Sequence, residues 1–168
     1  ENVSSFALLE YSFPLNLFFD IANSFVISFL VFCICKVYKI NYNLTFVLFL
    51  SCFTPFLFNG FIFDWTVFPD QSKYIRQSSE LRGLDYPLEE FRLSIHRLAI
   101  SKYIYSIIPV PFIEGFKSIG FANRFILILL IIFLVKKRFD ENFILILLLL
   151  SSIILYSSVS LRDNLIII

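Results

Sequence analysis

The 168-residue sequence is short of the residue types on which soluble, nucleic-acid-binding and disulfide-stabilised proteins depend. It has 4 Gly, 3 Cys and no Met, and charged residues make up only 16% of it. An average soluble domain carries about 25% charged residues. The 14 Lys and Arg almost balance the 13 Asp and Glu, so the chain lacks the basic field that nucleic-acid binding requires. These shortages exclude disulfide scaffolds and disordered chains, and we expect no nucleic acid among its partners.

Apolar residues, in contrast, are abundant. They make up 58% of the sequence, Phe alone occurs 23 times, and the mean hydropathy is +0.83. These values predict an integral membrane protein that has the lipid bilayer as its surroundings. Because the sequence starts at Glu1 without a Met and stops inside the apolar run Leu165 to Ile168, we expect it to be a piece of a longer protein.

Four apolar segments approach the length of roughly 20 residues that a helix needs to cross a hydrocarbon core about 30 Å thick. They cover residues 15–35, 44–63, 118–135 and 143–161. The second contains Pro55 and Gly60, which membrane helices tolerate when neighbouring groups satisfy the freed backbone. The third is long enough only if Arg124 snorkels to the membrane surface. The predicted fold is therefore all-α, a polytopic transmembrane helical bundle that forms a single membrane domain.

Short basic turns predict how this bundle lies in the membrane. Two turns are rich in Lys and Arg, one after the first segment and one after the third: Lys36 and Lys39, and Lys136, Lys137 and Arg138. Cytoplasmic loops carry an excess of Lys and Arg, so both turns are predicted to face the cytoplasm. Alternation of the spans then places the N-terminus and the loop over 64–117 on the outer side.

The loop over 64–117 is far longer than a connection between helices requires, and loops of this length are usually functional. Pro69 and Asp70 are typical of a helix start, with Asp70 able to cap the free N–H groups. In such a helix Tyr74 lies one turn from Asp70, with Arg76 close by. Two interpretations of Asp70 are equally open: a plain helix cap or a catalytic carboxylate.

Two further features are predicted in this loop. Apolar residues at helical spacing over 88–98 indicate an amphipathic helix in the plane of the lipid headgroups. The segment over 100–113 is too short to span and is interrupted by Pro109 and Pro111, which is typical of a re-entrant dip into the membrane. His96 is the only histidine, and no neighbouring ligands complete a metal set around it. A divalent cation is possible, but ligand spacing does not favour one, and we predict no metal or other cofactor.

Arg162 is the most distinctive charged residue. It follows the fourth apolar segment and precedes another apolar run, a position in which its guanidinium can hold a phosphate with two hydrogen bonds. An equally open interpretation is an anchor at the membrane surface or a salt bridge to Asp163.

Three short stretches carry a resemblance to known families: Phe68 to Tyr74, Ile107 to Phe112, and Ser157 to Asp163. Their order resembles that of EpsG-like and Wzy-type O-antigen or exopolysaccharide polymerases, and more loosely that of GT-C glycosyltransferases. The resemblance implies glycosyl transfer in surface polysaccharide synthesis, on the outer face of a bacterial inner membrane. It also implies a polyprenyl-phosphate- or diphosphate-linked glycan as substrate, with other polysaccharide-assembly membrane proteins as possible partners.

On this hypothesis Asp70 is the catalytic residue, because an acceptor hydroxyl needs a carboxylate to receive its proton. Arg162, with Arg124 or Arg76, would hold the lipid diphosphate and stabilise its charge as it leaves. Tyr74 is the remaining predicted substrate-binding residue.

Two alternatives to an enzyme stay open at the level of the sequence. One is a transporter or channel, in which Asp20 and Arg124 would be charges on a solute path inside the membrane. The other is a non-catalytic membrane subunit of a respiratory-type complex, which the composition rich in Phe and Ile fits equally well.

Overall fold

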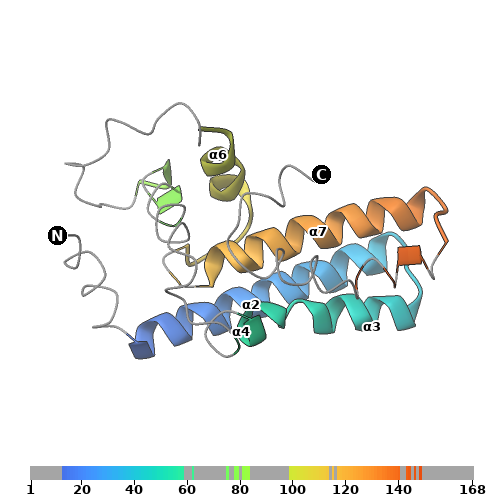
Figure 1. Ribbon diagram of the computed structural model, residues 1–168, viewed down its shortest axis with the longest axis horizontal. Helices are drawn as coiled ribbons and strands as arrows, with labels where there is room; N and C mark the ends of the chain where they lie inside the picture. The colour runs from blue at the N-terminus through green and yellow to red at the C-terminus, as the bar shows by residue number, and fades with distance from the viewer. Residues whose placement is uncertain are drawn as a thin grey trace.

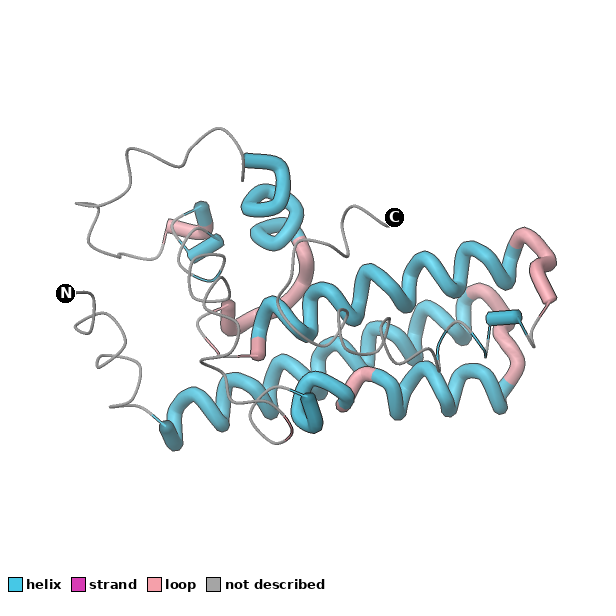
Figure 2. Tube along the Cα trace, in the orientation of Figure 1, coloured by secondary structure: helices cyan, strands magenta, loops and turns pink. Residues whose placement is uncertain are grey.

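In a computed structural model of the chain, helices and loops make up all of the part that is described, without a strand in it (Figures 1 and 2). The structure describes residues 13–58, 62, 75, 78–79, 81–83, 99–113, 115, 117–140, 143–144, 146 and 148. The helices are α2 (Phe13–Val37), α3 (Tyr42–Ser51), α4 (Thr54–Phe58), α6 (Ala99–Ile107) and α7 (Ser118–Lys136). The predicted all-α class is confirmed for this part of the chain.

Three helices lie side by side and position everything else (Figure 1). Helix α2 contacts both α7 and α3, and the short α4 contacts α7. Helices α2 and α7 run in the same direction: Asp20 near the start of α2 bonds Lys117 just before α7, and at the other end the Nζ of Lys136 lies 4.3 Å from the ring centroid of Tyr38. Helix α3 runs back along α2 after a tight turn. The two basic turns therefore lie at one end of the bundle.

Helix α2 is apolar outside and partly polar inside, unlike a soluble helix, whose polar residues face the solvent. Its exposed face carries large apolar side chains, among them Phe18, Phe25, Phe29 and Phe32. Phe25 and Phe29 are 65% and 66% exposed. Its buried face carries four polar side chains, Asp20, Asn23, Ser24 and Ser28, together with the apolar Ile27, Val31 and Cys35. Polar residues of membrane helices face the bundle interior, whereas a long exposed apolar face marks contact with lipid or a partner. This distribution indicates a membrane helix.

Two helices have the length and composition to cross a membrane, namely Leu17–Val37 and Ser118–Lys136. The first corresponds to the predicted span 15–35, and α2 extends beyond it by about one half-turn at each end. The second corresponds to the predicted span 118–135. Within the described residues, two of the four predicted spans are thus formed by single long helices.

The predicted span 44–63 is interrupted. It contains α3 and α4, which are separated by Cys52 and Phe53, and beyond Phe58 only Ile62 is described. The cause is Pro55, which has no N–H to donate to the carbonyl four residues earlier. That carbonyl belongs to Ser51, and the hydroxyl of Thr54 donates to it instead, over 2.9 Å. Over residues 44–58 the expected continuous helix is therefore replaced by two shorter helices, α3 and α4.

The predicted span 143–161 is described at four positions. Residues 143, 144, 146 and 148 are helical, and Ile144 and Leu148 are buried, one turn apart. The remainder of that span lies outside the described residues.

Candidate functional site

A cluster of polar side chains occupies the end of the bundle opposite the two basic turns. Its members come from α2, α6, the segment before α7, and α7 itself: Asp20, Asn23, Tyr105, Lys117, Asn123 and Arg124. We call this set the polar cluster. Except for Lys117, every member is at most 2% exposed. Buried polar groups need partners, and the bonds that provide them fix the chain around the cluster.

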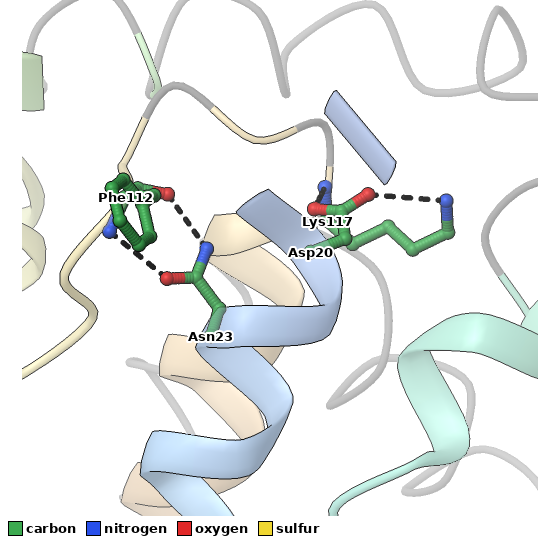
Figure 3. Close-up of polar contacts among 4 residues, drawn as sticks. All are labelled: Asp20, Asn23, Phe112 and Lys117. Carbon is green, nitrogen blue, oxygen red and sulfur yellow. Dashed lines mark hydrogen bonds and ion pairs between the residues drawn. The ribbon is translucent and has the colours of Figure 1, made fainter. Parts of the chain in front are cut away.

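Asn23 binds the backbone of Phe112 in both directions (Figure 3). The side-chain amide of Asn23 donates to the carbonyl of Phe112 over 2.6 Å, and the N–H of Phe112 donates to Oδ1 of Asn23 over 2.9 Å. One side chain thereby satisfies both backbone polar groups of a single residue, Phe112. The ring of Phe112 stacks on that of Phe19, with centroids 4.7 Å apart. The segment before α7 is consequently held on the buried face of α2.

Asp20 lies one turn before Asn23 and binds the residue that precedes α7 (Figure 3). The backbone N–H of Lys117 donates to Oδ1 of Asp20 over 3.0 Å, and the ammonium of Lys117 lies 3.3 Å from Oδ2. A carboxylate at a helix N-terminus is favoured because the free N–H groups there carry partial positive charge. Asp20 therefore caps α7 from another helix and pairs with the lysine at the same point.

Gly115 allows this close approach of the segment to α2. A Cβ on Gly115 would lie 2.7 Å from Oδ1 of Asp20 and 3.4 Å from Nδ2 of Asn23. The first distance is shorter than any normal contact between a carbon and an oxygen. Any side chain at this position would displace the carboxylate.

Two side chains, Tyr105 and Arg82, hold α6 in place beside the cluster. The hydroxyl of Tyr105 donates to Oδ1 of Asn123 over 2.7 Å, between two fully buried side chains. At the end of α6, the guanidinium of Arg82 donates to four backbone carbonyls: those of Tyr105, Ser106, Ile108 and Val110. The last carbonyls of a helix have no partner within the helix. Arg82 supplies those partners where Pro109 and Pro111 prevent the helix from continuing.

Arg124 is buried inside the bundle. It is 2% exposed, and its Nε donates over 3.0 Å to the carbonyl of Ser51, the same carbonyl that Pro55 leaves without a helical partner. This placement differs from the predicted snorkelling toward the membrane surface. The guanidinium is held in the interior because the broken end of α3 offers it an acceptor, and a cation is favoured at a helix C-terminus.

Of the predicted site residues, Arg124 is the one that the structure describes. The others lie outside the described residues: Asp70, Tyr74, Arg76 and Arg162. The predicted amphipathic helix over 88–98 lies outside them as well. Helix α6 ends before Pro109, as the proline pattern predicted for the segment over 100–113.

Sequence reasoning missed the role of Asn23, Tyr105 and Asn123 in holding the cluster together. A signal was present: Asp20 and Asn23 are three residues apart in an otherwise apolar run, and polar residues one turn apart share a helix face. The partner of Asn23 could not be predicted from the sequence, because Phe112 is 89 residues away and contributes only backbone groups.

The polar cluster acts as a scaffold, since the contacts described above join its groups to each other and to the backbone. It fixes the segment over 108–117 between α2, α6 and α7. Within the described ranges, no three His, Cys, Asp or Glu residues group so as to hold a metal ion.

Comparison with known proteins gives no match: no protein-family model, curated protein or solved structure is similar to this chain.

Proposed function

We propose that this chain is part of a membrane glycosyltransferase or polysaccharide polymerase that acts on sugars linked to polyprenyl phosphate or diphosphate. The reaction would take place at the end of the bundle that carries the polar cluster, on the outer face of the membrane. The class of reaction rests on the three short stretches that resemble EpsG-like and Wzy-type polymerases. The location rests on the arrangement of the bundle.

One observation carries the proposal most directly, namely the separation of the two ends of the bundle. The contact between Lys136 and Tyr38 brings both basic turns to one end, and the contact between Asp20 and Lys117 lies at the other. Basic turns favour the cytoplasmic side. The loop over 64–117, which ends at Lys117 in the polar cluster, would then lie outside, where a lipid-linked glycan can reach it.

In this proposal the residues divide into two groups. Asp70 would accept the proton of the sugar hydroxyl, and Arg162 with Arg76 would hold the lipid diphosphate, with Tyr74 against the sugar. Arg124 would act as a positioning residue, because its guanidinium is buried against Ser51. The segment that Asp20 and Asn23 hold would form one wall of the lipid site.

The test is transfer of labelled sugar from a lipid-linked donor by membranes that contain the full-length protein. We expect Asp70→Asn to lower the rate by about 100-fold or more, the usual loss for a general base. Arg162→Ala should lower it by a comparable factor. Asp85→Asn, in the same loop, is a matched control that should keep full activity. Unchanged transfer by both Asp70→Asn and Arg162→Ala, at normal protein levels, would refute the proposal.

The ion pair between the buried Asp20 and the partly buried Lys117 favours a second candidate, a transporter. Ionisable residues inside membrane bundles often mark ion or solute paths. Such a protein would move a solute into sealed vesicles without any lipid-linked sugar, and Asp20→Asn would abolish this uptake. A glycosyltransferase would show no uptake, and Asp20→Asn would reduce transfer only as far as it loosens the segment before α7.

A further inference from the structure

A pocket of about 270 Å³ opens at the turn between α2 and α3, at the basic end of the bundle. Lys36 and Lys39 line it together with Tyr42 and Thr45. None of the described residues that line it is acidic. One water takes about 30 Å³ in the liquid, so the pocket has room for a larger group. Two ammonium groups and the hydroxyl of Tyr42 are donors that suit an anion with several oxygens, whereas the hydroxyl of Thr45 bonds the thiol of Cys35.

The pocket adjoins the exposed apolar face of α2. Phe32 lines the pocket and is also the last phenylalanine of the exposed face that includes Phe25 and Phe29. The ammonium of Lys36 lies 5.8 Å from the ring centroid of Phe32, so its charge lies where the apolar face ends. A ligand that fits this surface is charged at one end and apolar at the other.

The backbone keeps Lys39 at this place in an unusual conformation. Its φ is +54°, in the left-handed region that glycine normally occupies after a helix. The N–H of Ile40 donates to the carbonyl of Cys35 over 3.0 Å, which closes the end of α2. Arg138 has the same conformation after α7, with φ of +64°, and Phe139 donates to Leu134 in the same way. The two turns therefore have the same geometry, but the pocket lies at the first.

From these observations we infer that the pocket binds the phosphate of an anionic membrane phospholipid, with the acyl chains along Phe32, Phe29 and Phe25. Two lysines complement the negative headgroup, and the phenylalanine face complements the chains. Basic pockets between membrane helices are suited to such headgroups. The inference is independent of the proposed enzymatic activity and requires only that α2 spans the membrane.

The test measures lipid bound to the full-length protein in detergent by native mass spectrometry, with phosphatidylglycerol and phosphatidylcholine as probes. We expect phosphatidylglycerol to bind preferentially. The double variant Lys36→Gln with Lys39→Gly should weaken its binding roughly 30-fold, as expected for two lysines at a headgroup. Glycine suits the left-handed turn, so this variant removes both charges without loss of the fold.

The matched control is Lys137→Gln with Arg138→Gly, which removes two charges from the equivalent turn at the same end. It should keep the affinity for phosphatidylglycerol within about threefold, because the pocket is intact. An equal loss of affinity in both double variants would show that the lipid is attracted by the total positive charge at this end of the bundle, and it would overturn the inference. Equal binding of the two lipids would overturn it as well. Inorganic phosphate should fail to displace the lipid at equal concentration, and displacement would mean that the site takes a soluble phosphate instead.

Discussion

The bonds between Asn23 and Phe112 make a quantitative prediction about the stability of the bundle. Asn23→Ala removes both of them, one of 2.6 Å and one of 2.9 Å, and leaves the N–H and carbonyl of Phe112 without this partner. Hydrogen bonds between membrane helices contribute between about 0.6 and 1.7 kcal/mol each. Two such bonds together amount to about 1–3 kcal/mol, which is a decrease of about 5-fold to 150-fold in the folding equilibrium.

The measurement is reversible unfolding of the full-length protein in mixed micelles, followed by helix content. The matched control is Ser24→Ala, on the same helix and equally buried, because among the described residues the hydroxyl of Ser24 bonds within α2, to Ile21 over 2.7 Å. We expect the control to lose less than about 0.6 kcal/mol. The reasoning is refuted if Asn23→Ala and Ser24→Ala unfold at the same denaturant concentration.

Three further predictions concern the same region. Gly115→Ala should destabilise by about 1–3 kcal/mol because its methyl group would collide with the carboxylate of Asp20, and unfolding as in the unsubstituted protein would contradict this close approach. Tyr105→Phe should destabilise by about 0.5–1.5 kcal/mol through loss of the bond to Asn123, which a thermal shift checks. Arg82→Lys should speed hydrogen exchange at the end of α6 without changing α7, since an ammonium cannot reach four carbonyls at once; unchanged exchange there would contradict the proposed cap.

Controls for these variants come from exposed positions. Phe25→Leu changes a side chain that is 65% exposed on α2 and should leave unfolding within about 0.5 kcal/mol. Tyr42→Phe removes a hydroxyl from a side chain that is 84% exposed, and it should behave in the same way. If either exposed variant lost as much stability as Tyr105→Phe, burial would not explain why the substitution of Tyr105 destabilises the protein.

The long helices could be predicted from the sequence because length and hydropathy decide them. The runs over 15–35 and 118–135 are almost uncharged, and the structure forms a helix over each. Backbone groups in a bilayer must be satisfied within the segment, so a local pattern is sufficient. The interruption of the helix at Cys52 and Phe53 could not be predicted in the same way. Pro55 was visible in the sequence, but not whether neighbouring groups would keep the helix continuous around it.

The polar contacts could not be predicted, because each depends on a partner far away in the chain. Arg124 stood out as a charge in an apolar segment, and snorkelling was the reasonable expectation for it alone. Its actual acceptor is the carbonyl of Ser51, 73 residues earlier. Asn23 likewise shows no partner in its own segment. A single sequence specifies which side chains need partners, and the packing of α2, α3 and α7 decides which partners they receive.

The orientation of the bundle is the central claim, and labelling of single cysteines tests it most directly. Lys39→Cys, Tyr74→Cys and Arg162→Cys would each be placed in the full-length protein after replacement of all its native cysteines, Cys33, Cys35 and Cys52 among them. A maleimide that cannot cross the membrane would then be added to intact cells. We predict that Tyr74→Cys and Arg162→Cys react and that Lys39→Cys reacts only after the cells are opened. Labelling of Tyr74→Cys and Arg162→Cys from opposite sides would contradict the account.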